Sequence, residues 1–408
     1  MISNIKYKIL NIKLLGIGYF ILVFGLFLYS FTQVDLNLTL SQWPIWQIIQ
    51  KFFQHIGYFQ RPISTYFYIA IILLLYAFYF LNLWLIRIGK IRGIWILIIA
   101  TTIILTFSYN AFSYDLFNYI FDAKIITNYH QNPYLHKALD YPGDPMLSFM
   151  RWTHRLYPYG PTWLGLTIPL SFVGFNVFLP TLYLFKTLIA ASFLGTAYFL
   201  KKIIDYSKIQ NALYSISLFA LNPLVLIESL VSAHNDIVMM FFAVLALYLL
   251  LRKRYIFGFT FLAVSIGIKF ATILLLPVFI YIAIMQLKNK TIDFKTIFMI
   301  IFILMCAGVA ITSFSSGTNK SPELQPWYFL MALPFAALIA QKRIVFFLTT
   351  CVSFGLLLSY IPYIQTGEWP KDIVELKIKL LICSIGIAVF LYIISSKRIY
   401  ASVKNILK

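Results

Sequence analysis

The stretch that decides how this chain is organised runs from Ser113 to Pro161 and reads SYDLFNYIFDAKIITNYHQNPYLHKALDYPGDPMLSFMRWTHRLYPYGP. It is a polar block between long apolar segments, rich in acids, histidines, tyrosines and turn-forming prolines. A membrane protein that only has to reverse its direction needs a few residues for the turn, whereas this loop has about fifty. We therefore interpret residues 113–161 as a candidate reaction site at a membrane surface.

The composition of the whole chain predicts an all-α polytopic membrane protein. Of its 408 residues, 61% are hydrophobic and only 11% are charged, and the mean hydropathy is +0.85. Soluble domains carry about a quarter charged residues. Lipid accepts only helices or closed barrels, and apolar segments of about twenty residues without strict alternation favour helices. Because these segments follow one another from end to end, residues 1–408 are expected to form one domain.

The apolar segments predict about twelve transmembrane helices. We interpret the first as an uncleaved span, because residues 14–32 are too long for a signal peptide and lack a small-residue cleavage site. Residues 162–175 form a further apolar piece. A further full crossing would put the two termini on opposite sides of the membrane, so we interpret this piece as re-entrant or interfacial. Whether it crosses the membrane stays open. The predicted spans lie near residues 13–32, 64–86, 94–112, 178–200, 211–226, 237–251, 255–268, 270–286, 296–314, 326–341, 344–363 and 376–396.

Charged residues are distributed unequally between the two predicted faces. One set of turns, together with both termini, carries 21 of the 33 basic residues but only two acids, Asp205 and Asp293. The positive-inside rule makes this face cytoplasmic. The other eleven acids and all five histidines then lie on or near the outer face. The net charge of +20 is thus explained by membrane topology rather than by nucleic-acid binding.

Within the long loop, the spacing of Asp115, Tyr119 and Asp122 predicts one face of a short helix. A carboxylate at the edge of an apolar cavity can act as a general base towards a hydroxyl nucleophile, which suggests that role for Asp115. The alternative is a solvated or tyrosine-bonded carboxylate at a helix end. The nearby Tyr159 could stack on a sugar or belong to the aromatic belt at the interface.

A second polar cluster interrupts the apolar segments in the middle of the chain. Glu228, His234, Asn235 and Asp236 stand at the predicted outer ends of two spans, where such groups are costly unless they line a polar cavity. For Asp236 alone, capping of the next helix is an equal alternative. Taken together, the four residues favour a functional site.

Three further residues complete the candidate site. Lys269 closes a predicted outer hairpin; it either snorkels or, as a lone cation, pairs with a phosphate. Trp327 and Tyr328 open another span at the same level, as sugar-stacking residues or as interface anchors. The three cysteines lie inside apolar segments, so neither a disulfide framework nor a metal cluster is indicated, and a divalent metal stays an open question.

In their order along the chain, these motifs resemble the GT-C superfamily of membrane glycosyltransferases, and most closely the bacterial polyprenol-phosphate-mannose-dependent α-mannosyltransferases. The resemblance covers residues 105–340, over half of the chain. It rests on the Asp115 loop with Asn132-Pro133-Tyr134, Tyr159-Gly160-Pro161 followed by a Trp, His234-Asn235-Asp236, the basic turn Arg252–Arg254, Lys269, and Gln325-Pro326-Trp327-Tyr328.

The resemblance implies a catalytic acid in the first large outer loop, which corresponds to Asp115. It implies transfer of a hexose, with mannose as first candidate, from a polyprenyl-phosphate donor to a glycan or glycolipid hydroxyl outside the cytoplasmic membrane. Lys269 and Arg155 would stabilise the leaving phosphate. The further substrate-binding candidates are Tyr119, Asp122, Tyr159, Glu228, His234, Asn235, Asp236, Trp327 and Tyr328.

The chain departs from the family pattern in two ways. It is shorter than many relatives, and its acid pair is Asp115 with Asp122 rather than two adjacent acids, which leaves the base and any metal requirement open. An O-antigen polymerase or ligase is an alternative, but its large loop usually comes late and relies on Arg and His. A lipid or solute transporter predicts internal repeats and mid-membrane ionisable residues, which are not evident here.

Overall fold

The apolar segments of the chain fold into helices, and no strand occurs among the residues that the computed structural model describes, 2–91, 93–315 and 323–406. The prediction of an all-α polytopic membrane protein is confirmed. The α-helices are α1 (Ile2–Ser30), α2 (Pro44–Gln54), α3 (Arg61–Arg87), α4 (Ile94–Thr106), α5 (Asp115–Thr127), α6 (Pro161–Val173), α7 (Phe178–Tyr206), α8 (Ala212–Ala220), α9 (Pro223–Leu226), α10 (Asp236–Leu251), α11 (Tyr255–Ile266), α12 (Leu276–Leu287), α13 (Phe294–Ser315), α14 (Leu333–Leu338), α15 (Arg343–Leu358), α16 (Ile361–Thr366) and α17 (Ile373–Ile406).

Seven of the described helical segments are long and apolar enough to cross a membrane. The pair α8 and α9, continued to Val231, is a further candidate span that is bent by 54°. Four shorter apolar segments, α4, α10, α11 and residues 326–338, coincide with the remaining predicted spans. Each of the twelve predicted spans therefore corresponds to a helical segment, and the number that crosses the membrane stays a prediction.

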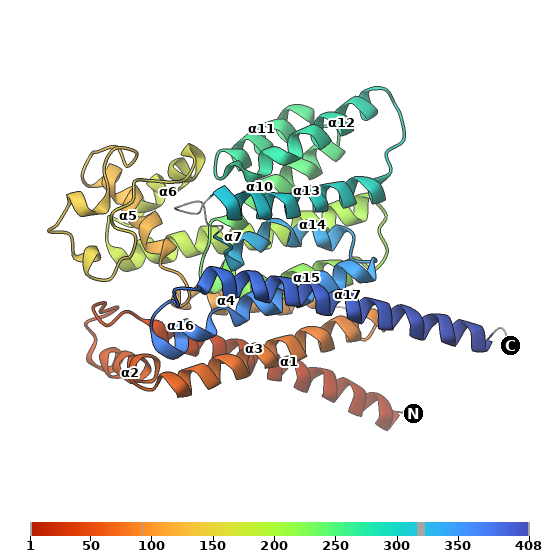
Figure 1. Cartoon of the computed structure of the whole chain (residues 1–408), viewed down its shortest axis with the longest axis horizontal. Coiled ribbons are helices and arrows are strands. Elements are labelled where there is room, and N and C mark those ends of the chain that lie inside the picture. The colour runs from red at the N-terminus through yellow and green to blue at the C-terminus, as the bar shows by residue number, and fades with distance from the viewer. Residues whose placement is uncertain (1, 92, 316–322, 407–408) are drawn as a thin grey trace.

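The remaining short apolar helix is α6, which covers the piece of undecided topology. At 13 residues it is about 20 Å long, well below the ~30 Å of a bilayer core. It packs beside α5, away from the chain termini (Figure 1). A re-entrant or interfacial position stays the prediction for α6.

Two details differ from the sequence expectations. Helix α4 ends at Thr106 rather than near residue 112. In the turn that follows, Lys186 of α7 donates to both oxygens of Ser108, at 2.5 and 2.9 Å. The sequence analysis also placed no helix between the first two spans, where α2 lies. Its buried Gln50 and Gln54 donate to the carbonyls of Leu38 and Asp35, while its apolar face is exposed.

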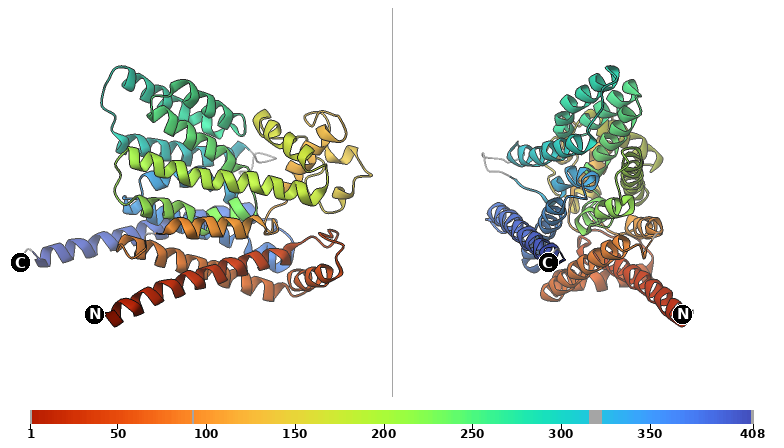
Figure 2. Two further views of the ribbon diagram at one scale, coloured as in Figure 1. Left: turned by 180° about the vertical axis from the view of Figure 1, so that it is seen from behind. Right: turned by 90° about the vertical axis from the view of Figure 1, so that its right-hand side faces the viewer.

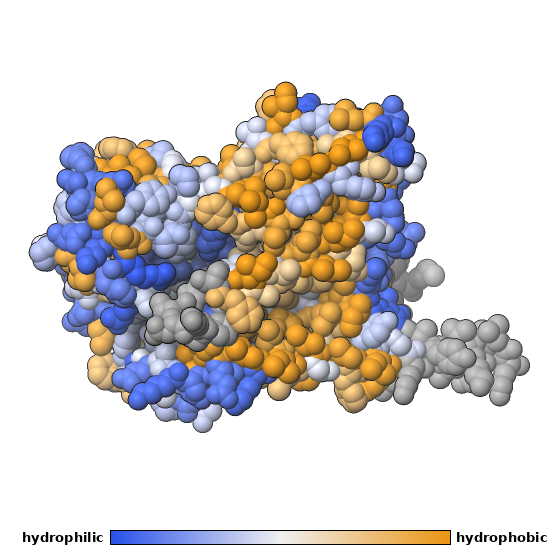
Figure 3. Space-filling view, turned by 45° about the horizontal axis from the view of Figure 1, so that its top comes forward, coloured by the Kyte–Doolittle hydropathy of each residue, from blue (hydrophilic) through white to orange (hydrophobic). Residues whose placement is uncertain are grey.

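The helices run roughly parallel to one long axis, and both termini lie at the same end (Figures 1 and 2). The polar segment that contains α5 and α6 lies at the opposite end. Apolar residues cover the middle of the face shown in Figure 3, with hydrophilic residues gathered towards the two ends. This arrangement separates the long loop from the basic turns, as the charge asymmetry predicted.

A few specific contacts hold the long loop together and attach its end to the neighbouring helices. The buried Asp144 accepts hydrogen bonds from Lys124 of α5 at 2.5 Å and from Tyr129 at 2.6 Å. At the end of the loop, the amide of Gly160 donates to the carbonyl of Ile268 at 3.1 Å. A Cβ on Gly160 would lie 2.1 Å from the carbonyl oxygen of Gly267, so only glycine permits this approach. The contact places the loop directly beside Lys269.

Candidate active site

A cavity of about 330 Å³ lies where the long loop meets the ends of the helices. Five separate parts of the chain line it, so no single segment of sequence contains the site. The lining residues are Asp115, Trp152, Arg155, Pro158, Tyr159, Gly160, Ile268, Lys269, Phe270, Ala271, Thr312, Glu323, Gln325, Trp327, Tyr328 and Met331.

Asp115 enters the cavity as the first residue of α5, and its side chain is 16% exposed. Its Oδ2 lies 3.5 Å from Nδ1 of His234, and Nε2 of the same ring lies 3.4 Å from Oε2 of Glu228. His234 and Glu228 are completely buried. The three residues form a carboxylate–imidazole–carboxylate chain that leads from the cavity into the protein interior.

Local backbone conformation positions His234. Residues 227–231 form one π-helical turn, and Ala233 takes a left-handed conformation with φ 58°. The His234 amide then donates to the Glu228 carbonyl at 3.0 Å. The imidazole stacks on Trp327 with a centroid distance of 4.0 Å and an interplanar angle of 15°. The strain of the left-handed residue and the stacking fix the ring between the two carboxylates.

The carboxylates of Asp115 and Glu228 determine the protonation state of His234. Burial opposes the charged imidazole, but Asp115 and Glu228 outweigh it and raise the pKa of His234 to about 9. Burial likewise opposes the ionised Asp115, yet the contact with His234 lowers the pKa of this carboxyl below its ordinary value. At neutral pH we therefore expect an imidazolium beside an ionised Asp115.

Asp122 lies on the same face of α5, and it adjoins Asp115 and Arg155 in a second, smaller cavity. Burial raises the pKa of Asp122 to about 8; Arg155 opposes this shift and Asp115 adds to it. Asp122 is thus largely protonated at neutral pH, whereas Asp115 is ionised. Two carboxyls at helical spacing consequently differ in what they can do, because only Asp115 can accept a proton.

Lys269 is not the lone cation that the sequence suggested. Its Nζ lies 2.6 Å from Oδ2 of Asp236, and it also lies 5.5 Å from the centre of the Tyr159 ring. The Asp236 carboxylate is completely buried and begins α10. Its side chain bonds to Lys269, and the residue that precedes the helix is Asn235, so the capping alternative for Asp236 is not supported.

The predicted residues occupy two layers. Asp115, Arg155, Tyr159, Lys269, Trp327 and Tyr328 line the main cavity, with Asp122 in the adjoining one. The residues that lie behind these, buried, are Tyr119, Glu228, His234, Asn235 and Asp236. Tyr119 donates to Oδ1 of Asn235 at 3.3 Å and packs edge-to-face on Tyr159 at 5.1 Å. This second layer orients the cavity-lining side chains.

Sequence reasoning missed one polar chain at the cavity wall. The buried Lys377 of α17 donates to Oε1 of Gln325 at 2.7 Å, and Gln325 donates to Oε1 of Glu323 at 2.8 Å. A lysine in the first turns of an apolar span was the available signal. Tyr360 was missed as well; its hydroxyl donates to Glu228 at 2.9 Å.

The sequence left a metal requirement undecided. Among the described residues, no group of three or more His, Cys, Asp or Glu side chains is arranged to hold a metal ion.

Comparison with known proteins supports the resemblance seen in the motifs. Alpha-(1->6)-mannopyranosyltransferase A of Corynebacterium glutamicum is 26% identical over 186 residues, which are 45% of this chain. The match spans 37% of the length of that relative. No solved structure matches the chain. Residues 17–285 match the family model described as "Alpha-(1->6)-mannopyranosyltransferase, N-terminal domain", a region that contains Asp115, His234 and Lys269. The chain therefore belongs to this family of mannosyltransferases.

Proposed function

We propose that this protein transfers a mannosyl group from a polyprenyl-phosphate donor to a hydroxyl of a glycan or glycolipid on the outer face of the cytoplasmic membrane. The observation that carries the proposal is the convergence of an ionised Asp115 with Lys269 and Arg155 in one cavity beside the membrane-spanning helices. Family membership and the mannosyltransferase relative of Corynebacterium glutamicum support mannose as the sugar.

The acceptor hydroxyl loses its proton to Asp115 as its oxygen attacks the anomeric carbon. The bond from that carbon to the phosphate oxygen breaks, and the lipid phosphate leaves with the electron pair. The departing group is already anionic, so no proton donor is required for it. Its growing charge is stabilised by Lys269 and Arg155, which are positioned before the reaction.

Binding of the sugar is assigned to the aromatic side chains of the cavity. Trp327 and Tyr328 come from residues 326–331, and Tyr159 comes from the end of the long loop. Such rings offer flat apolar faces to a sugar, while neighbouring polar groups supply hydrogen bonds. A volume of about 330 Å³ is at the lower end of the range for small-molecule sites, which suits one hexose with its phosphate.

The buried second layer keeps this site polar and preorganised. Nδ2 of Asn235 and Oδ1 of Asp236 are buried without a hydrogen-bond partner in the described part of the chain. Buried polar groups of this kind are costly and are typical of functional sites. The imidazolium of His234 keeps Asp115 ionised, and Trp327 stacks on the same ring, which couples the proposed base to the proposed sugar platform.

The orientation follows from the charge distribution. The last turn of α3 and the turn between α12 and α13, which carry basic residues, lie towards the end with both termini, whereas α5, which begins at Asp115, lies at the other end (Figure 1). Positive residues remain on the cytoplasmic side of a membrane. The proposed site therefore faces the outside, where a lipid-linked donor is available and nucleotide sugars are not.

The direct test is transfer of labelled mannose by the full-length protein in proteoliposomes supplied with polyprenyl-phosphate mannose and a membrane extract as acceptor. Asp115→Asn is expected to lower transfer by ~10²–10⁴-fold, since the amide cannot accept a proton. Asp140→Asn is the matched control, because Asp140 is an exposed acid of the same loop outside the cavity. Equal activity of the wild type and Asp115→Asn would refute the assignment of the base.

A further inference from the structure

A separate and larger cavity, of about 610 Å³, lies at the end of the protein that carries both termini. It is enclosed by the C-terminal end of α3, the first residues of α8 and α15, and the later turns of α17. It shares no lining residue with the cavity described above. Nothing in the proposed transfer reaction uses it.

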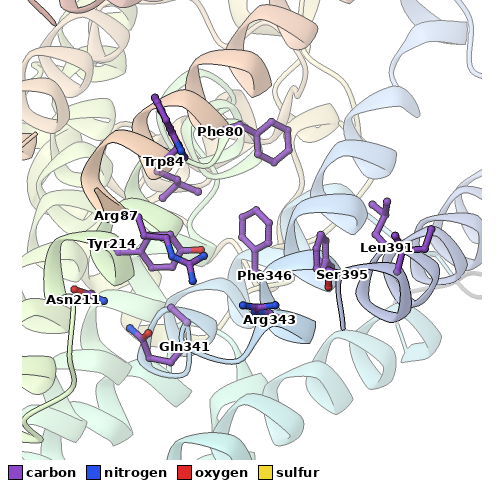
Figure 4. A pocket seen from close by; sticks show the side chains of 14 residues that line it. Phe80, Trp84, Arg87, Asn211, Tyr214, Gln341, Arg343, Phe346, Leu391 and Ser395 are labelled. Carbon is purple, nitrogen blue, oxygen red and sulfur yellow. The ribbon is translucent and has the colours of Figure 1, made fainter. Parts of the chain in front are cut away.

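One half of this cavity is polar and positively charged. Figure 4 shows the side chains of Arg87, Arg343, Asn211 and Gln341 in the same half of the cavity. None of the described lining residues is acidic, and within the described chain neither arginine forms a salt bridge. Arg343 is also the first residue of α15, so the positive end of that helix dipole lies at the same point. This half is complementary to an anion.

The other half is apolar. Phe80 and Trp84 of α3 lie away from the polar half, and Phe346 of α15 and Leu391 of α17 continue the apolar wall (Figure 4). Three of these side chains are substantially exposed: Phe80 at 45%, Trp84 at 55% and Leu391 at 38%. They belong to two of the segments long and apolar enough to cross a membrane, α3 and α17. The apolar wall thus opens towards the hydrocarbon region.

We propose that this cavity binds an anionic phospholipid of the leaflet in which the two termini lie. The head-group phosphate contacts the guanidinium groups of Arg87 and Arg343, and Asn211 and Gln341 provide further polar contacts. An acyl chain lies along Phe80, Trp84 and Leu391. A free phosphate shares the head-group chemistry, but it would leave the apolar half uncovered. Basic pockets between membrane helices commonly recognise anionic lipids in this way.

A bound lipid would connect elements that are distant in the sequence. At this end, α17 and α3 stand on different sides of the cavity, and Arg343 at the start of α15 lies between them. A lipid that contacts all three would hold α17 against the rest of the bundle. The proposal does not rest on mannosyl transfer, because it concerns separate residues at the other end of the protein.

The proposal is tested on the full-length protein, purified in a neutral detergent, by native mass spectrometry with added phosphatidylglycerol. We expect phosphatidylglycerol to bind and phosphatidylcholine to bind much more weakly. Each arginine near a lipid head group contributes about a fivefold change in affinity, so Arg87→Gln/Arg343→Gln is expected to weaken binding of phosphatidylglycerol by about 25-fold. The charge-matched control is Lys253→Gln/Arg254→Gln, which removes two exposed cations from the same end outside the cavity.

Each arm of this experiment supports or overturns the proposal. Undiminished binding of phosphatidylglycerol to Arg87→Gln/Arg343→Gln, or equal losses in the control pair, would overturn it. Competition by glycerol phosphate or inorganic phosphate at the same concentration as the lipid would show a free-anion site instead. Asp115→Asn should bind phosphatidylglycerol normally, so failure of the proposed mannosyl transfer is distinguished from failure of the lipid site.

Discussion

Replacing Lys269 by Met separates its structural role from its proposed role in binding the donor. Lys269 is 16% exposed, whereas its partner Asp236 is completely buried 2.6 Å away. Removing one member of a buried ion pair leaves the other uncompensated, at a cost of about 3–5 kcal/mol. Because Lys269 is partly solvated, we expect the lower value, about 3 kcal/mol. The methionine retains much of the apolar contact of the lysine stem.

The pair predicts an asymmetry between its two single variants. Asp236→Asn leaves a lysine that still reaches the cavity, so the expected loss in the free energy of unfolding is smaller, about 1 kcal/mol. The double variant Lys269→Met/Asp236→Asn removes both charges and should recover most of the loss of Lys269→Met. Thermal unfolding of the four proteins, followed by tryptophan fluorescence in detergent, measures this double-mutant cycle.

Donor kinetics on the same four proteins complete the test. If Lys269 contacts the donor phosphate, the double variant recovers stability but still uses polyprenyl-phosphate mannose poorly. Lys269→Arg should restore part of that use, because it keeps the charge and changes the geometry. The reasoning about the ion pair is refuted if Lys269→Met unfolds at the wild-type temperature. The assignment to the donor is refuted if the double variant regains full transfer.

Three further predictions address the pH dependence, the loop and the orientation. Transfer should decline above about pH 8 as Asp122 ionises beside the donor phosphate, and Asp122→Asn should lack this alkaline decline in a pH–rate profile. The raised pKa of Asp122 also means that the folded state binds a proton more tightly than the unfolded state, so its contribution to stability falls as the pH rises from about 4 to 8. Gly160→Ala should separate the loop from Gly267 and lower the transfer activity. Gly143→Ala should leave the activity unchanged, because no atom lies within 4 Å of its added Cβ. Equal activities of the two variants would refute the packing argument. On a cysteine-free background, an impermeant thiol reagent should label a cysteine at Ser148 in intact cells but not one at Lys290, and the reverse pattern would invert the proposed topology.

Sequence patterns sufficed for the membrane architecture because lipid imposes strict local rules. A run of about twenty apolar residues has to be helical, so this feature can be read without knowing any contact. The orientation that the positive residues indicate stays a prediction. The same logic identified Glu228, His234 and Asp236, since ionisable groups among apolar spans are costly and therefore conspicuous. The positions of α5 and of the long loop followed from the polarity of residues 113–161.

Only the tertiary structure decided which of these residues touch one another and in which direction the pKa values of Asp115, Asp122 and His234 shift. Asp115 and Asp122 have equivalent side chains at helical spacing, but His234, more than one hundred residues later, favours the charged form of Asp115, while burial favours the neutral form of Asp122. Lys269 could be recognised as an anomalous cation, but its pairing with Asp236 depends on the close approach of two helix ends. Local sequence determines which groups prefer helix, lipid or water, whereas pKa values and ion pairs depend on distances across the fold, which short-range patterns do not encode.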